Sequence, residues 1–127
     1  MKLRIKGNSL RLRLSRTEVR ELVANGYVEG RTVFGPSFGE QLVYRIKKGG
    51  NTIVTGHLEN GQITVTAPAA IVDEWAGGDQ LGFSGRQSLE SGDVLDILVE
   101  KDLVCLKPRE TEDESDNFPH PDAVSSC

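Results

Sequence analysis

Residues 2–14 read KLRIKGNSLRLRL, and leucine or isoleucine alternates with lysine or arginine on both sides of Gly7-Asn8-Ser9. A period of two is typical of a strand that buries one face and exposes the other. Gly, Asn and Ser favour a tight turn between two such strands. The stretch therefore predicts a β-hairpin with one aliphatic face and one row of cations.

A helix is expected directly after this hairpin. Ser15-Arg16-Thr17-Glu18 has the spacing in which a serine side chain and a glutamate side chain accept hydrogen bonds from each other's backbone N–H at a helix start. Asn25-Gly26 then supplies the left-handed residue at which a helix commonly ends. These signals predict a short helix between the two positions.

Turn signals divide the chain that follows into further strands. Asn60-Gly61 is the strongest short signal for a two-residue hairpin, and Pro68 suits the first turn of a second short helix over residues 69–76. The pattern predicts one α+β domain at residues 1–107, built as hairpin, helix and meander, with a mostly antiparallel sheet of six to eight strands. No internal repeat is visible in the sequence.

Charge is segregated along the chain although its net value is only −4. Residues 1–25 carry seven cations against two anions, whereas residues 100–127 carry eight anions against three cations. Residues 108–127 contain few apolar side chains and are expected to form an acidic tail beyond the domain.

Composition and motifs exclude several classes of protein. The 127 residues suffice for one domain, and no apolar run is long enough to span a membrane. No apolar segment of a secretory signal follows Met1, so a cytoplasmic protein is expected. No phosphate-binding glycine loop, zinc-protease motif or nucleophile elbow is present, so the sequence favours a non-enzymatic protein. The negative net charge argues against general nucleic-acid binding.

The cations of the first hairpin indicate a binding site for an acidic protein or a small anionic ligand. Phe118 precedes Pro119 in a segment biased toward an extended conformation, which would lower the entropy lost when its ring enters a groove. The acidic tail would compete with the partner for the same cations. The residues expected in this site are Arg4, Arg11, Arg13, Arg16 and Phe118.

A metal-binding protein is an alternative function. Cys105, His120 and Cys127 are the candidate ligands for a divalent metal, although their spacing matches no standard zinc motif. Apart from that metal, the sequence calls for no cofactor.

Two resemblances follow from these motifs. Residues 5–15 resemble the opening of AbrB/MazE-type antitoxin domains, which implies a dimeric swapped hairpin that binds DNA through Arg11 and Arg13. The chain departs from that pattern at Ser15, where those domains have an Ile-Pro entry to the helix. Over residues 1–14, 99–103, 105–106 and 112–119 the chain is similar to a small uncharacterised bacterial family, a domain of unknown function, for which no activity is implied.

Overall fold

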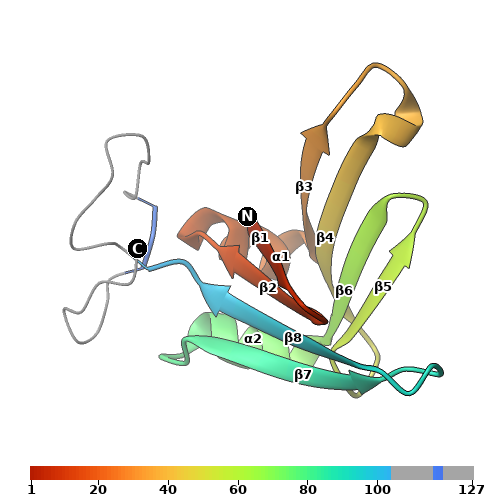
Figure 1. The fold of residues 1–127 in the computed structure, drawn as a ribbon. Coiled ribbons are helices and arrows are strands. Elements are labelled where there is room, and N and C mark those ends of the chain that lie inside the picture. Colours follow the sequence, from red (N-terminus) through yellow and green to blue (C-terminus); the bar gives the residue numbers. More distant parts are fainter. Residues whose placement is uncertain (104–115, 119–127) are drawn as a thin grey trace.

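The computed structural model describes residues 1–103 and 116–118, which form two helices and two four-stranded sheets (Figure 1). In chain order the elements are β1 (Lys2–Lys6), β2 (Ser9–Leu14), α1 (Arg16–Asn25), β3 (Tyr27–Val33), the 3₁₀ turn η1 (Phe38–Glu40), β4 (Gln41–Gly49), β5 (Thr55–Glu59), β6 (Gln62–Pro68), α2 (Ala69–Gly77), β7 (Gly82–Ser88) and β8 (Val94–Lys101).

Both sheets are mixed. Their strand orders are β1-β2-β8-β7 and β3-β4-β6-β5, and in each sheet the two central strands run parallel while both outer pairs are antiparallel. The α+β class is confirmed, but the expected mostly antiparallel sheet and its meander are wrong. Turn signals reveal hairpins only, because a parallel pair joins strands that are far apart in the sequence.

The two sheets are related by an internal repeat of the pattern strand, strand, helix, strand, strand. The first half is β1-β2-α1-β3-β4 and the second half is β5-β6-α2-β7-β8. If each strand is replaced by its counterpart in the other half, the strand order of one sheet becomes that of the other sheet, read in reverse. The register agrees. Val65 is the equivalent of Leu12 and Val99 is the equivalent of Ile46, each 53 positions later in the sequence. Leu12 pairs with Val99, and correspondingly Val65 pairs with Ile46. The expectation of no internal repeat is therefore corrected, because the halves share apolar spacing and topology rather than residue identities.

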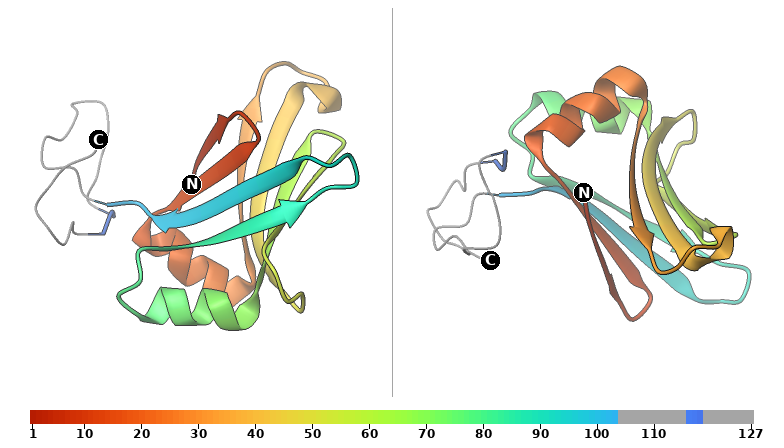
Figure 2. Two further views of the ribbon diagram at one scale, coloured as in Figure 1. Left: turned by 60° about the horizontal axis from the view of Figure 1, so that its bottom comes forward. Right: turned by 90° about the horizontal axis from the view of Figure 1, so that it is seen from above.

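The core repeats this spacing from one half to the other. Leu12, Leu14, Val19 and Leu22 are buried in the first half, and residues 53 positions later are buried in the second, namely Val65, Ala67, Val72 and Trp75. The helices lie side by side at one end of the sheets (Figure 2). The Trp75 indole donates a hydrogen bond to the Leu81 carbonyl at 3.1 Å and packs edge-on against Phe83.

Both ends of α1 form as the sequence predicts. The Ser15 hydroxyl accepts a hydrogen bond from the Glu18 N–H at 3.3 Å, the Glu18 carboxylate accepts one from the Ser15 N–H at 2.9 Å, and Gly26 ends the helix with φ 88°.

Neither helix has a basic residue in its last turn. Equivalent lysines on the strands supply that charge, because Lys48 Nζ donates to the Val23 carbonyl and Lys101 Nζ to the Gly78 carbonyl.

Among the described residues, a hydrogen bond joins the two sheets along one side only. Between β5 and β7 the Gly56 N–H donates to the Gln87 side-chain oxygen at 2.7 Å, and Gly85 of β7 lies against Val54, the residue directly before β5. The equivalent strands β1 and β3 share no hydrogen bond in the part of the chain that the structure describes. On this side the β1–β2 hairpin and β3 diverge as they leave the helical end (Figure 1).

Gly85→Ala tests the packing of the joined side. A Cβ at this position would lie 2.5 Å from Val54 Cβ and 3.0 Å from the Val54 carbonyl oxygen, so Val54 or the backbone has to move. We expect a loss of about 1–3 kcal/mol in the free energy of unfolding, measured by urea denaturation. The control is Gly39→Ala, whose Cβ meets nothing within 4 Å. Equal stability of the two variants would contradict a tight β5–β7 contact.

Candidate functional site

Five cations lie on the outer face of the β1–β2 hairpin. The antiparallel register sets Lys2 opposite Arg13 and Arg4 opposite Arg11, and Lys6 continues the row toward the turn. The leucines between them point to the other face, where Leu12 and Leu14 are buried. We call this surface the cationic face, and its members are Lys2, Arg4, Lys6, Arg11 and Arg13.

Only two carboxylates of the described residues pair with these five cations. Lys2 Nζ lies 3.0 Å from Asp102 Oδ2. Glu100 Oε1 lies between the Nε atoms of Arg11 and Arg13, at 3.2 and 3.6 Å. Within the described residues Arg4 and Lys6 form no ion pair. The surface therefore keeps a local positive charge although the whole chain is negative.

The hairpin fold itself does not require these cations. Like charges directly opposite each other on neighbouring strands are destabilising, yet Arg4 stands opposite Arg11. The equivalent hairpin β5–β6 has the same two-residue connection and reaches the same kind of sheet without them. The residues that lie 53 positions after the five cations are Thr55, His57, Glu59, Thr64 and Thr66.

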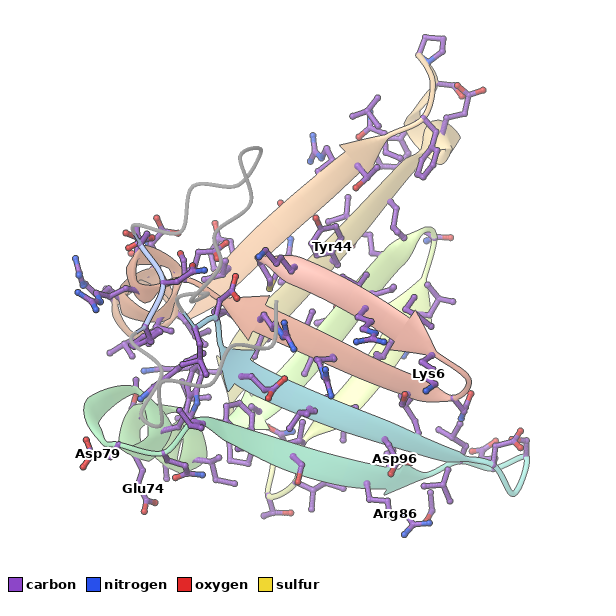
Figure 3. The ribbon with its side chains drawn as sticks, turned by 60° about the vertical axis from the view of Figure 1, so that its left-hand side comes forward. Lys6, Tyr44, Glu74, Asp79, Arg86 and Asp96 are labelled. Carbon is purple, nitrogen blue, oxygen red and sulfur yellow. The ribbon has the colours of Figure 1, made fainter. Side chains whose placement is uncertain are left out.

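Two shallow hollows lie in the surface around the cationic face. Lys2, Arg4, Arg11 and Arg13 line one of about 160 Å³. A larger hollow of about 500 Å³ continues from Arg11 over Leu98 to β7, where Ser84 and Arg86 line it. Figure 3 looks onto this face, and Lys6 and the Arg86–Asp96 pair lie toward the turn of the β1–β2 hairpin. The hollows give a carboxylate or phosphate group room beside the arginines.

The residues expected in the binding site separate into two groups. The structure brings Arg4, Arg11 and Arg13 together, whereas Arg16 begins α1 and lies beside Phe118. The Arg16 guanidinium carbon is 5.6 Å from the centre of the Phe118 ring, and Lys101 Nζ is 5.1 Å from it. Phe118 also bridges Leu103 in a short parallel contact. Phe118 thus contacts residues of its own chain in this structure.

The expectations for the site omitted residues of two kinds. Lys2 and Lys6 belong to the cationic face. The period of two in residues 2–6 places them on the same side of the strand as Arg4, so this pattern could have included them in the predicted site. Glu100 and Arg86 reach the surface from β8 and β7, and no local pattern connects those strands with the first hairpin.

The candidate metal ligands Cys105, His120 and Cys127 lie outside the described residues, so that site stays a prediction. Among residues 1–103 and 116–118, no group of three or more His, Cys, Asp or Glu side chains could hold a metal ion. His57 is exposed and lies 3.3 Å from Glu59.

A segment near the C-terminal end of the chain is held at the start of α1. The Asp116 carbonyl accepts a hydrogen bond from the Arg16 N–H at 2.8 Å, and its carboxylate accepts bonds from the Thr17 N–H and hydroxyl. The pKa of Asp116 lies below its usual value, chiefly because the Ser15 hydroxyl donates to the carboxylate; desolvation opposes this shift, and the Thr17 bonds and the Arg20 charge assist it. An anion at a helix N-terminus is also favoured by the helix dipole.

These features define a class: an α+β protein made of two similar halves, with one sheet face strongly cationic. Over residues 1–122 the chain matches the model of a family of unknown function, DUF7009, and it belongs to that family, which confirms the resemblance to a domain of unknown function. No curated protein and no solved structure matches it. These comparisons do not support the similarity to AbrB/MazE-type domains. In the described part of the chain no helix has the length and apolar character needed to cross a membrane.

The contact of Asp116 with α1 predicts a pH dependence. Because the pKa is lower in the folded state, this carboxylate stabilises the fold above the ordinary aspartate pKa of about 3.9. Its contribution is lost as the pH falls through that value toward the lower folded pKa. Asp116→Asn should therefore be less stable than the parent at pH 5, and the difference should shrink toward pH 2, measured by urea unfolding at each pH.

Thr17→Val serves as the partial variant, since it removes the hydroxyl donor but keeps the carboxylate and the Thr17 backbone N–H. We expect an effect of the same sign and smaller size. Unfolding curves of the parent and Asp116→Asn that stay a constant distance apart from pH 5 to pH 2 would contradict the assignment.

Proposed function

We propose that this protein is a non-enzymatic binding protein whose cationic face holds an acidic partner. The observation that carries the proposal is the surplus of five cations on one hairpin face over the two carboxylates that pair with them among the described residues. The same positions of the equivalent hairpin hold threonine, histidine and glutamate. Since the fold forms without the charges in one half, their concentration in the other half is explained by binding.

The electrostatics favour a partner with several negative groups. Attraction between exposed charges is largely screened beyond about 8 Å at physiological salt, so the overall negative charge of the chain does not cancel contacts made at this face. Alternate residues of a strand stand about 6.6–6.8 Å apart, and residues opposite each other on paired strands about 4.5–5.5 Å apart. A ligand with repeated carboxylates or phosphates reaches several cations at once, whereas a single anion reaches one or two.

The double variant Arg4→Ala, Lys6→Ala tests the face directly. Both side chains lack an ion pair among the described residues, so their loss removes charge without stranding a carboxylate. We expect binding of fluorescein-labelled poly-L-glutamate, measured by fluorescence anisotropy, to weaken about tenfold, since two exposed ion pairs are together worth about 1.4 kcal/mol.

The matched control is Arg31→Ala, Lys47→Ala, which removes two exposed cations from the outer face of the other sheet. This variant should bind poly-L-glutamate as the parent does. An equal loss in both double variants would show that binding follows overall charge, and the proposed face would be wrong.

We propose further that the acidic stretch at residues 110–114 competes with the partner. The stretch lies outside the described residues, between Leu103 and Asp116, and its four carboxylates are the densest negative charge in the chain. Neutral substitutions test competition better than truncation, because truncation also removes Asp116 and Phe118 and their contacts with α1.

Neutralising Glu110, Glu112, Asp113 and Glu114 to their amides should strengthen poly-L-glutamate binding by about threefold or more, as expected for the loss of a competing ion pair of roughly 0.7 kcal/mol. The control carries four neutral substitutions at exposed glutamates on other surfaces, which are Glu21, Glu59, Glu74 and Glu90. Equal affinities of the two variants would contradict competition by the stretch.

A further inference from the structure

Strand β1 is an edge strand, and no strand of the described residues pairs with its outer side. It pairs with β2 on one side, and residues 3–5 form no backbone hydrogen bond on the other side within the described part of the chain. Every second residue of such a strand directs its N–H and C=O away from the sheet. The equivalent strand β5 has β7 close by, with the hydrogen bond between Gly56 and Gln87. The edge of β1 faces the viewer in the right-hand view of Figure 2.

The two faces beside this edge differ in chemistry. On the outer face stand Arg4 and Lys6, which lack an ion pair among the described residues. On the inner face Leu3 is half-buried and Ile5 is 57% exposed. A strand laid along β1 would therefore meet cations on one face and aliphatic side chains on the other, in alternation.

The opposite side of the same hairpin already shows such a pairing. β8 lies parallel to β2, and its outward Glu100 contacts both Arg11 and Arg13. Its inward neighbours Ile97 and Val99 are buried in the core. An outward carboxylate and inward apolar side chains thus satisfy one edge of the hairpin, and β1 presents similar chemistry on the other edge, where no strand of the described residues pairs with it.

We propose that the edge of β1 binds an extended segment of a partner protein, with alternating acidic and apolar residues, as a fifth strand of its sheet. This inference rests on the proposed function and names the partner chemistry for the same face. Main-chain hydrogen bonds supply affinity in this mode of binding, and alternate side chains supply specificity. The carboxylates lie beside Arg4 and Lys6, and the apolar side chains lie beside Ile5.

Other occupants fit the edge less well. A second copy of β1 would set lysine and arginine against lysine and arginine, which is destabilising and is a common defence of edge strands against self-association. A single-stranded nucleic acid would use the cations but would leave the backbone groups of β1 and the exposed Ile5 unused.

The experiment compares two labelled peptides on the full-length protein by fluorescence anisotropy. One has the alternating sequence Glu-Val-Glu-Ile-Glu-Val-Glu, and the other has the same composition in blocks, Glu-Glu-Glu-Glu-Val-Ile-Val. We expect the alternating peptide to bind about tenfold or more tightly than the block peptide, because only it forms the main-chain bonds and both side-chain contacts together. Arg4→Ala, Lys6→Ala should weaken its binding.

Backbone methylation of the peptide then tests strand pairing without altering the protein. One derivative carries N-methyl groups on its glutamates and another on its apolar residues, and only one of these sets points toward β1. We expect one derivative to lose binding and the other to retain it. Amide hydrogen exchange at residues 3–5 should slow when the unmethylated peptide is bound.

The outcomes separate this inference from the proposed function. If the alternating and block peptides bind equally and both depend on Arg4 and Lys6, strand addition is overturned while the anionic partner stands. If neither peptide binds and poly-L-glutamate also fails to bind, both proposals fall. If oligothymidylate displaces the alternating peptide and binds more tightly than it, the partner is a nucleic acid and strand addition is overturned.

Discussion

The rest of the structure depends on the parallel pairing of the two halves. Leu12 of β2 pairs with Val99 of β8, Ile46 of β4 pairs with Val65 of β6, and all four side chains are buried. Each sheet is thus half made of each repeat, so neither half completes a sheet alone. The same pairing carries Glu100 to Arg11 and Arg13 and leaves β1 at the edge, so the chemistry of the cationic face follows from how the halves join.

The two halves share a fold and differ where binding is proposed. Equivalent positions hold the core and the lysines Lys48 and Lys101 that cap the helices. On the outer faces the halves diverge, since Arg4 has His57 as its equivalent. They also diverge at the edges, where β5 and β7 are joined and β1 and β3 are not.

Leu103, Asp116 and Phe118, which flank residues 104–115 in the sequence, are held by contacts with the domain. Leu103 and Phe118 form a bridge, and Asp116 is bonded to the start of α1. Lys101 is nearly buried beneath Phe118, and desolvation lowers its pKa against the opposing charge of Asp79. The pairing of Lys2 with Asp102 sets this anchor next to the first strand of the cationic face.

Local structure could be predicted from the sequence because its causes lie within a few residues. The period of two in residues 2–14 determined the first hairpin and gathered its cations on one face, and the spacing from Ser15 to Glu18 determined the start of α1. Only the tertiary structure decided that the sheets are mixed, that Arg16 lies beside Phe118, and that β1 is an edge strand of its sheet. Parallel pairing of Leu12 with Val99 joins distant parts of the chain without a turn, so no short pattern records it.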